Sequence, residues 1–281
     1  MRTYFSLTLA VASMLNSAPS FADTLVEAFD SGTNRNGWTW GFGDTLQTSG
    51  GHPNGYLRTD GLDTYAPQPR PTAPNSPYVG DYRAAGVTCI GIDLITYHVD
   101  FSAGGRPLTL MLIDDNGTPD VFEDDTAAYF MHAQNVPLEG QGWMTYDFTV
   151  PSDQSQLPSG WLLLNLGDSG SPPIHSWNQV IQHVSNMQFF YGDPTFFFIF
   201  QQWVLGLDNA RICVSPPLPC PADVSPAPAG NGVVNIDDLL TVIGAWNHTG
   251  TPGTMLGDVT GNGVVNIDDL LAVISAWGGC P

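Results

Sequence analysis

Two segments near the C-terminus, 232–246 (GVVNIDDLLTVIGAW) and 263–277 (GVVNIDDLLAVISAW), are identical at 13 of 15 positions and are offset by 31 residues. An internal repeat of this length is typical of one supersecondary unit used twice, because a single unit cannot bury its own apolar side chains. The repeat therefore predicts a small C-terminal module made of two similar halves.

The second copy begins with a loop of twelve residues, 258–269, whose oxygen-bearing side chains have the spacing of a calcium-binding loop. Gly263 at the sixth position permits a sharp turn, and calcium prefers six or more hard oxygen ligands. The predicted ligands are Asp258, Thr260, Asn262, the carbonyl of Val264, Asn266 and Asp269. We expect one calcium ion in this loop.

After each loop, apolar residues recur at helical spacing, which predicts a helix with one apolar face. Asn266 is the expected N-cap of the second helix. The apolar face of the second copy comprises Ile267, Leu270, Leu271, Ile274 and Trp277, and that of the first comprises Ile236, Leu239, Leu240, Ile243 and Trp246. We predict that the two helices pack against each other through these faces.

This duplicated loop and helix, 220–281, resembles the dockerin family, whose modules bind calcium in each repeat and dock onto cohesin modules or tether exported proteins in larger assemblies. The resemblance places the ligands of the first loop on Asp223, Ser225, Asn231, Val233, Asn235 and Asp238. Four extra residues, 226–229, make this first site degenerate. Hydroxyl side chains at the third position of both loops also remove charge from the shells and should weaken them.

The resemblance also implies a partner-binding pair at the tenth and eleventh loop positions. Here these positions are Ile236, Asp237, Ile267 and Asp268. Type I dockerins commonly carry Ser-Thr there, so the resemblance does not imply that this chain has their partner specificity. We expect a cohesin-like or cell-surface anchoring partner that can bind either copy. The alternative is that the repeats form only a small calcium-stabilised tail.

The N-terminal segment 1–22 has an early Arg2, an apolar stretch and small residues before Asp23, a pattern typical of a cleaved secretory signal. Its apolar stretch is too short to span a bilayer. The chain has 7 basic and 27 acidic residues, for a formal charge of −20. Such a charge disfavours nucleic acid and anionic membrane surfaces as partners. We expect a secreted or cell-surface-associated protein without a membrane span.

Four cysteines in an exported chain indicate disulfides. Cys220 and Cys280 stand at the two ends of the C-terminal module, which favours a disulfide between them. Cys89 and Cys213 are then partners by default, or free thiols.

Segment 23–214 contains short apolar alternations interrupted by Gly, Pro, Asn and Asp, which predicts a jelly-roll-like antiparallel β-sandwich. The expected strands are 38–42, 91–101, 108–113, 126–131, 142–150, 161–166, 187–191 and 196–212. One short helix is expected at 174–184 and a Pro-rich loop at 66–77. A Pro-rich linker, 215–221, then leads to the helical module, 220–281, so the whole chain is expected to be mostly β.

Trp38, Trp40 and Phe42 alternate, so their side chains leave the same face of a strand. On a surface they would form a platform for stacking against a sugar ring. Against the opposite sheet they would belong to the core, which is the commoner position of large aromatic side chains.

The segments 27–30 (EAFD) and 205–212 (LGLDNARI) resemble the first and last strands of jelly-roll carbohydrate-binding modules. In that group a structural calcium ion often joins those strands. The resemblance implies one further calcium site at Asp208, with Glu27 or Asp30.

Two other segments could carry chemistry. Segment 167–172 (GDSGSP) is similar to the nucleophile segment of chymotrypsin-type proteases, but no upstream histidine motif accompanies it, so a simple turn is favoured. The acidic segment 114–125 could hold a cation or a pair of catalytic carboxylates, whose separation the sequence does not define. A solvated or calcium-tightened hairpin is favoured there, and no catalytic residue is assigned.

These observations predict an exported, non-catalytic protein whose sandwich binds a ligand or surface, polysaccharide or matrix, and whose calcium-binding tail anchors it. One alternative is a polysaccharide-degrading hydrolase or lyase, which carboxylates beside exposed aromatic side chains in a groove would favour. The other is a purely structural surface protein, which a polar sandwich face without a groove would favour.

Overall fold

The computed structural model describes residues 23–31, 35–101, 103–119, 121–214, 220–226, 230–251 and 255–280. The predicted signal segment, 1–22, and most of the predicted linker lie outside this part of the chain. Within it, no helix has the length and apolar character needed to cross a membrane.

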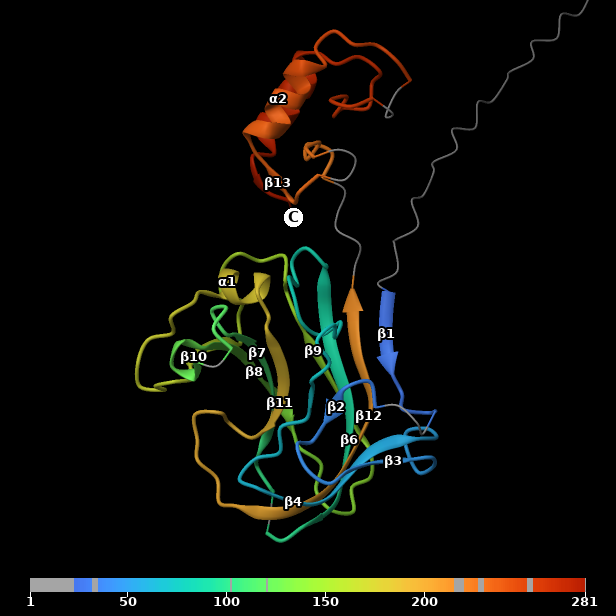
Figure 1. Cartoon of the computed structure of the whole chain (residues 1–281), viewed down its shortest axis with the longest axis vertical. Coiled ribbons are helices and arrows are strands. Elements are labelled where there is room, and N and C mark those ends of the chain that lie inside the picture. Colours follow the sequence, from blue (N-terminus) through green and yellow to red (C-terminus); the bar gives the residue numbers. More distant parts are fainter. Residues whose placement is uncertain are drawn as a thin grey trace, which may run out of the picture.

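Antiparallel strands form two sheets in the N-terminal part of the chain, which confirms the predicted β-sandwich (Figure 1). The first sheet has the order β3-β4-β12-β6-β9, and β1 also pairs with β12. Its strands are β1 (Asp23–Glu27), β3 (Asp44–Gln47), β4 (Tyr56–Thr64), β6 (Val87–Val99), β9 (Met144–Thr149) and β12 (Gln201–Val214). The first half of β12 pairs with β4 and its second half with β1, so β12 unites the sheet.

The second sheet has the order β10-β8-β7-β11. Its strands are β7 (Pro107–Asp114), β8 (Thr126–Asn135), β10 (Trp161–Asn165) and β11 (Asn186–Tyr191). Two short pairs, β2 (Trp38–Thr39) with β5 (Arg70–Pro71) and β13 (Val233–Val234) with β14 (Gly278–Gly279), complete the strands. The helices are the 3₁₀ turn η1 (Phe122–Asp124), α1 (Trp177–Gln182), α2 (Ile236–Gly244) and α3 (Ile267–Ser275).

The second sheet is apolar on both faces, because successive side chains of a strand point to opposite sides. On β7, Leu110 and Leu112 belong to the main core, whereas Met111 and Ile113 belong to a smaller cluster. That smaller cluster also contains Ala66, Ala127, Tyr129, Leu164 and Phe190. A second apolar layer therefore covers the outer face of this sheet.

Several sequence-based boundaries were wrong. Segment 196–200 is not a strand, since β12 starts only at Gln201, and the strand predicted at 38–42 is limited to β2. The sequence analysis also missed β1, β3 and β4, whose sequences are rich in Asp, Thr and Gly. Such residues have weak intrinsic strand preference. β1 and β4 pair with the long, apolar β12, and β3 pairs with β4, and this pairing overrides that preference.

In the tail, each loop pairs with the segment that follows the other helix. Val233 and Val234 of the first loop pair with Gly279 and Gly278, beyond α3. In the second loop, the backbone N–H of Val265 donates to the carbonyl of His248, beyond α2, at 2.9 Å. Each half thus completes the other, which is the physical reason for the duplication.

The predicted packing face of the tail helices was wrong. Val242 of α2 and Val273 of α3 are fully buried, with Leu239 and Leu270 packed beside them. In contrast, the apolar residues on the adjacent side of each helix are exposed to solvent. Each helix is apolar over a wider arc than the helix pair can cover, so only one side of that arc is buried.

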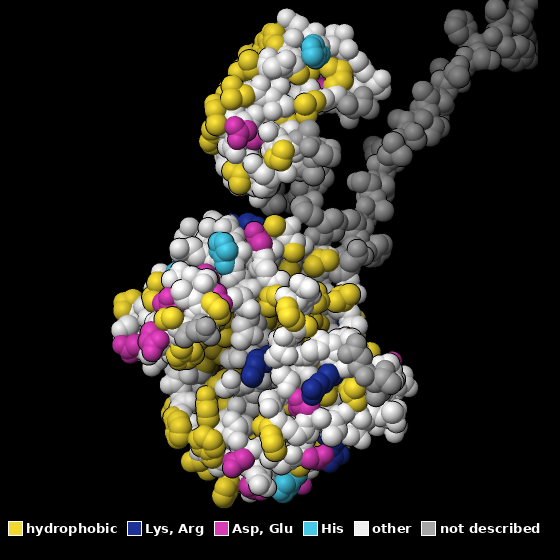
Figure 2. All heavy atoms as spheres, in the orientation of Figure 1, with side chains coloured by type: hydrophobic (Ala, Val, Ile, Leu, Met, Phe, Trp, Pro, Cys, Tyr) yellow, Lys and Arg dark blue, Asp and Glu magenta, His cyan; other side chains and the backbone are white. Residues whose placement is uncertain are grey.

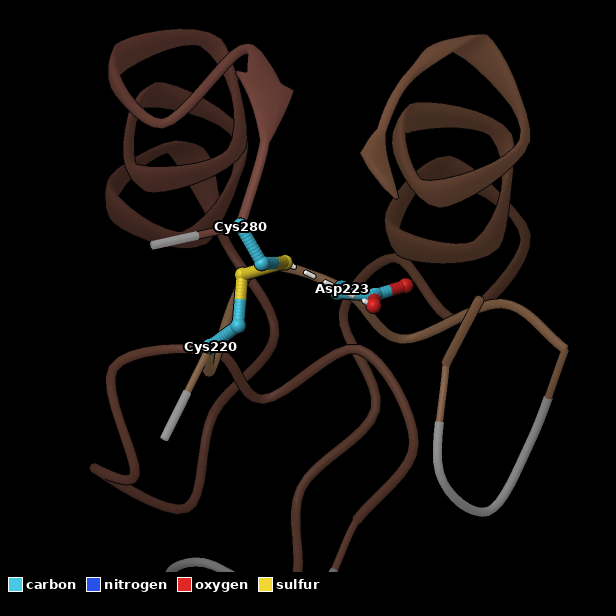
Figure 3. Close-up of side chains that lie close together, drawn as sticks. All are labelled: Cys220, Asp223 and Cys280. Carbon is cyan, nitrogen blue, oxygen red and sulfur yellow. Dashed lines mark hydrogen bonds between the residues drawn. A yellow bond between two sulfur atoms is a disulfide. The ribbon is translucent and has the colours of Figure 1, made fainter. Parts of the chain in front are cut away.

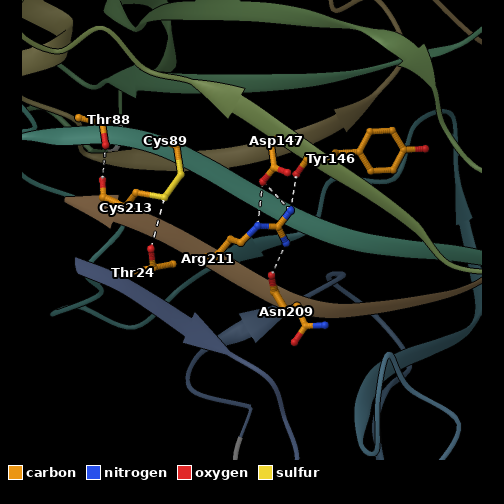
Figure 4. Close-up of a disulfide and its surroundings, with 8 residues drawn as sticks. All are labelled: Thr24, Thr88, Cys89, Tyr146, Asp147, Asn209, Arg211 and Cys213. Carbon is orange, nitrogen blue, oxygen red and sulfur yellow. Dashed lines mark hydrogen bonds and ion pairs between the residues drawn. A yellow bond between two sulfur atoms is a disulfide. The ribbon is translucent and has the colours of Figure 1, made fainter. Parts of the chain in front are cut away.

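Both disulfides join strands or ends that the fold already holds close. Cys89 on β6 and Cys213 on β12 are direct cross-strand partners and form one disulfide (Figure 4). Cys220 and Cys280 form the other, with 5.9 Å between their Cα atoms, as the sequence favoured.

Candidate metal loops, helix face and groove

The second tail loop is closed by its first and last carboxylates. The two carboxylate oxygens of Asp258 accept hydrogen bonds from the backbone N–H groups of Asn262 and Gly263, at 3.0 and 2.9 Å. Those of Asp269 accept from the N–H groups of Thr260 and Asn266, at 2.9 and 2.8 Å. These bonds wrap the loop around two carboxylates, of which Asp269 is fully buried.

The first loop makes the same bonds despite its insertion. Asp223 accepts from the N–H groups of Asn231 and Gly232, and Asp238 accepts from those of Ser225 and Asn235. The insertion, 226–229, includes residues outside the described part of the chain. A side chain at Gly230 would collide with the carboxylate of Asp223, so glycine permits this close approach. Both loops thus bring their predicted terminal acids into equivalent places.

The amide side chains serve the turn and the helix start. The Oδ1 atom of Asn262 accepts from the N–H of Val264, and that of Asn231 accepts from Val233. Asn266 caps α3, as predicted, by accepting from the N–H of Asp268. Asn235 caps α2 in the same way. In this structure the predicted ligand oxygens therefore also hold the loop conformation.

The charge of the tail is unbalanced. Segment 220–281 contains six Asp and no Glu, Lys or Arg. Asp238 and Asp269 are nevertheless fully buried. Burial raises the pKa of Asp269, but hydrogen bonds from Thr260 and Asn266 outweigh it and hold this pKa below its usual value. A buried, ionised carboxylate without a basic residue nearby is the environment that a hard cation stabilises, so the donor set fits calcium.

Cys220, Asp223 and Cys280 lie together beside the first loop, with Cys280 Sγ 3.6 Å from an Asp223 oxygen (Figure 3). Because both sulfur atoms belong to a disulfide, neither is a thiolate that could ligate a metal. The disulfide instead fixes both ends of the tail next to the first carboxylate of the loop.

The two tail helices leave matching apolar residues exposed. On α2 and just beyond it, these are Ile236, Leu240, Ile243 and Trp246, and on α3 they are Ile267, Leu271, Ile274 and Trp277. Figure 2 shows hydrophobic side chains gathered along the edge of the tail where α2 lies. The predicted partner-binding residues Asp237 and Asp268 are exposed beside them. We call these two sets the helix faces.

Of the two positions considered for Trp38, Trp40 and Phe42, the structure supports the core for the tryptophans and excludes the platform. Trp38 and Trp40 are 1% and 2% exposed, whereas Phe42 is 68% exposed. Trp38 packs edge-on against Tyr78 at 5.2 Å between ring centroids, and Trp40 packs against Tyr191 at 6.1 Å. The two tryptophans thus belong to the core, and Phe42 alone cannot form a platform.

The predicted sandwich calcium residues lie in one region but have separate partners. Asp208 is fully buried and accepts from the N–H groups of His52 and Asn209, at 2.6 and 2.8 Å. Burial raises the pKa of Asp208 to about 7. Glu27 accepts from the N–H of Phe29, and Asp30 from that of Gly55. A calcium ion here remains a prediction that rests on Asp208.

An ion-pair network lies next to Asp208. Arg211 donates to Asp93 at 3.1 Å and to Asp147 at 2.6 Å, and it also bonds to the carbonyls of Asn209 and Tyr146 (Figure 4). This network joins β12, β6 and β9 and neutralises Asp93, so it accounts for that buried acid without a metal.

The acidic segment 114–125 is held by hydrogen bonds in the described residues. His175 lies 2.7 Å from Asp114, and Asp124 accepts from the side chains of Asn116 and Thr118. The similar GDSG segment is a turn in which Asp168 accepts from Gly170 and Ser171. Neither arrangement places a serine nucleophile beside a histidine.

A groove that the sequence analysis missed lies on the outer face of the second sheet, with a volume of about 800 Å³. Its floor includes Met111, Leu164 and Phe190, from the outer apolar layer. Its walls include Tyr65 and Asp125. The acidic segment 114–125 and the turn 167–172, both singled out in the sequence, contribute lining residues such as Asp125 and Asp168, but nothing in the sequence placed them together.

No protein-family model matches this chain, and none of the curated proteins matches it. Among solved structures, it is similar to an exo-beta-agarase at 13% identity and a TM-score of 0.38, over 68% of this chain and 25% of that one. It is similar to CtCBM11 at 14% identity and a TM-score of 0.36, over 72% and 99% of the two chains. It is also similar to SGBP-B from a complex xyloglucan utilization locus in Bacteroides uniformis, at 12% identity and a TM-score of 0.27, over 63% and 47%. Values this low carry no information about ligand or activity.

Proposed function

We propose that this chain is an exported, non-catalytic protein with two working parts. The β-sandwich holds a ligand, polysaccharide or matrix. The tail is a calcium-folded, dockerin-like module that docks onto a cohesin-like or cell-surface partner. The observation that carries the proposal is the pair of matching, solvent-exposed helix faces above two equivalently bonded acidic loops.

The helix faces support docking because each is an apolar surface that the fold leaves uncovered. Leu240 and Leu271 occupy equivalent positions and are 55% and 52% exposed. Isolated exposed apolar residues are ordinary, but contiguous apolar surface is characteristic of interaction sites. The acidic pair Asp237 and Asp268 borders these faces, so we expect a partner with an apolar centre and basic residues at its edge.

Calcium would be held in the second loop by Asp258, Thr260, Asn262, the carbonyl of Val264, Asn266 and Asp269, and in the first loop by the equivalent residues. The positive charge of a bound calcium ion would compensate the two carboxylates of each loop. Since the loops position the start of α2 and α3, ion binding stabilises the helix faces and thus docking.

The test is a titration of the purified chain with calcium, followed by binding to an immobilised cohesin module. Calcium should raise the melting temperature of the tail and permit capture, and chelator should reverse both. Asp258→Ala with Asp269→Ala should abolish both effects at the second loop, whereas Asp268→Asn, on the exposed side, should retain calcium binding. An identical melting curve with calcium and with chelator would refute the proposal for the tail.

A second candidate function is cleavage of a polysaccharide, because the groove contains carboxylates in different environments. Burial and four neighbouring acids raise the pKa of Asp125 to about 6, while hydrogen bonds from Ser171 and Gly170 lower that of Asp168. A raised pKa on one carboxyl group and a lowered pKa on another are typical of a general acid and a general base. Release of reducing sugar by the purified chain, and its loss in Asp125→Asn, would establish this function in place of the non-catalytic one.

A further inference from the structure

The groove on the outer face of the second sheet is built from several segments that are distant in sequence. The segment after β4 contributes Tyr65, the segment after β7 contributes Phe122 and Asp125, and β11 contributes Gln188. A side chain at Gly167 would collide with the backbone of Glu123, so glycine lets the loop after β10 close this wall. The groove is therefore a formed feature of the sandwich.

Aromatic side chains line the groove. Tyr65 stacks on Phe197 with 5.9 Å between ring centroids and an angle of 18°, and it packs obliquely on Phe190 and Phe200. Phe122, which also lines the groove, is 59% exposed. In Figure 2, hydrophobic side chains gather on the sandwich near the loop that leads into β12. Aromatic faces of this kind suit the C–H faces of sugar rings.

Polar groups in the groove have hydrogen-bonding capacity left for a ligand. Among the described residues, Gln188 donates only to the sulfur of Met111, at 3.6 Å, which is a weak acceptor. The Oδ1 atom of Asp125 is buried without a hydrogen-bond partner in the described part of the chain, while the side chain as a whole is half-buried and lines the groove. Ligand hydroxyl groups that donate to the accessible part of the Asp125 carboxylate and accept from Gln188 would use this capacity.

The negative charge of the groove favours neutral glycans over anionic ones. Asp115, Asp125 and Asp168 line it, and no Arg is among the described lining residues. Arg106, beside the aromatic side chains, is buried, lies 4.1 Å from the ring centre of Phe198 and donates to the Tyr65 carbonyl. Arg70 donates to the carbonyl of Gln68. A uronate or sulfated chain would meet uncompensated negative charge here, whereas a neutral chain would meet hydrogen-bond acceptors.

We infer that this groove binds a neutral glycan chain, with sugar rings stacked on Tyr65 and Phe122 and hydroxyl groups bonded to Asp125 and Gln188. The inference rests on the proposed function of the sandwich and assigns its binding site and ligand class. It moves the site from the predicted Trp38 platform to the outer face of the second sheet.

The test is affinity electrophoresis of the full chain in gels that contain hydroxyethylcellulose, arabinoxylan, galactomannan, laminarin or agarose. Polygalacturonate and alginate serve as anionic probes. At least one neutral glycan should retard the chain, and neither anionic probe should. For the neutral glycan that binds, Phe122→Ala and Gln188→Ala should each weaken affinity by about tenfold in calorimetry.

Phe42→Ala is the matched control, because Phe42 is an equally exposed aromatic residue outside the groove. Tyr65→Phe should bind as the parent does, whereas Tyr65→Ala should lose binding and also lower the melting temperature, because Tyr65 packs against three phenylalanines. If Tyr65→Ala fails to fold, Phe122→Ala and Gln188→Ala decide the question, since both side chains are partly or largely exposed.

Binding of a neutral glycan that survives the groove substitutions would overturn the groove assignment and leave ligand binding by the sandwich intact. Binding of the anionic probes alone would overturn the ligand class. Retardation by none of the glycans would overturn the inference, while calcium-dependent docking of the tail would still be measured separately.

Discussion

Asp269 and Thr260 are joined twice: one carboxylate oxygen of Asp269 accepts from the backbone N–H of Thr260 at 2.9 Å and from its hydroxyl at 2.8 Å. In the first loop, the corresponding bond to Asp238 comes from the backbone N–H of Ser225. Asp238 also accepts from the backbone N–H of Val224 at 2.8 Å. The last acid of each loop thus closes the turn from inside with three bonds, and only the second loop uses a hydroxyl donor.

Replacing the closing acid should destabilise the tail even without calcium. Asp269→Asn removes the charge that three donors stabilise, and hydrogen bonds to a charged group each contribute roughly 1.5–3 kcal/mol. We expect a loss of about 3 kcal/mol in unfolding free energy, measured by urea denaturation in chelator. Asp268→Asn, exposed one residue earlier, is the control and should change stability by less than about 0.5 kcal/mol.

The hydroxyl at the third loop position should matter more in the second loop. Thr260→Val removes the side-chain donor to Asp269, with an expected loss of about 1 kcal/mol. Ser225→Ala should have a smaller effect, because the serine bond to Asp238 comes from its backbone. Equal losses for both variants in denaturation experiments would contradict the asymmetry between the loops.

The helix faces should act as two interchangeable docking surfaces. Leu240→Asp alone should lower the apparent affinity for a cohesin-like partner only about twofold, because the equivalent face on α3 remains, and the loss is then statistical. Leu240→Asp combined with Leu271→Asp should abolish binding. Complete loss with one substitution, measured by surface plasmon resonance at unchanged melting temperature, would show that only one face docks.

The tail disulfide should be essential for the stability of the module. It joins residues separated by 60 positions, and closing a loop of that size stabilises a fold by about 4 kcal/mol in the chain-entropy description. Cys220→Ser with Cys280→Ser should therefore lower the tail's melting temperature and increase its dependence on calcium. Cys89→Ser with Cys213→Ser should leave the calcium response of the tail unchanged.

The unfolding free energy of the protein should fall as the pH rises, because Asp125 lies in the groove. Desolvation and four neighbouring acids raise the folded-state pKa of Asp125 to about 6, above the value of about 4 for an unfolded Asp. Between these values the folded state binds more protons, so unfolding free energy should fall as the pH increases from 4 to 6 and then level off.

Asp125→Asn should reduce that fall, as measured by urea denaturation at pH 4, 5, 6 and 7. Asp168→Asn is the control with the opposite sign, because hydrogen bonds from Ser171 and Gly170 lower the pKa of Asp168, and Asp168 is not among the acids that raise the pKa of Asp125. A parent protein whose stability rises steadily over this range, unchanged in Asp125→Asn, would contradict the raised pKa.

Much of the architecture could be predicted because periodic signals are local. Long apolar runs on β6, β7 and β11 identified strands, since burial on one or both faces requires such runs. The short strands β1 and β3 have no such run, and only the partner strand defines them. The repeat predicted both tail helices, and Asn266 was predicted as the cap of the second, because capping is a contact between near neighbours in sequence.

The sequence by itself determined the two-part organisation, the duplicated acidic loops and a net charge that disfavours anionic partners, because these depend on residue type and spacing. Only the tertiary structure decided which apolar residues are covered. Trp38 and Trp40 enter the core, Leu240 and Leu271 stay exposed, and Tyr65 and Phe122 line one groove. The reason is physical: burial depends on what the rest of the chain places opposite a side chain, and that arrangement is not encoded in any single segment.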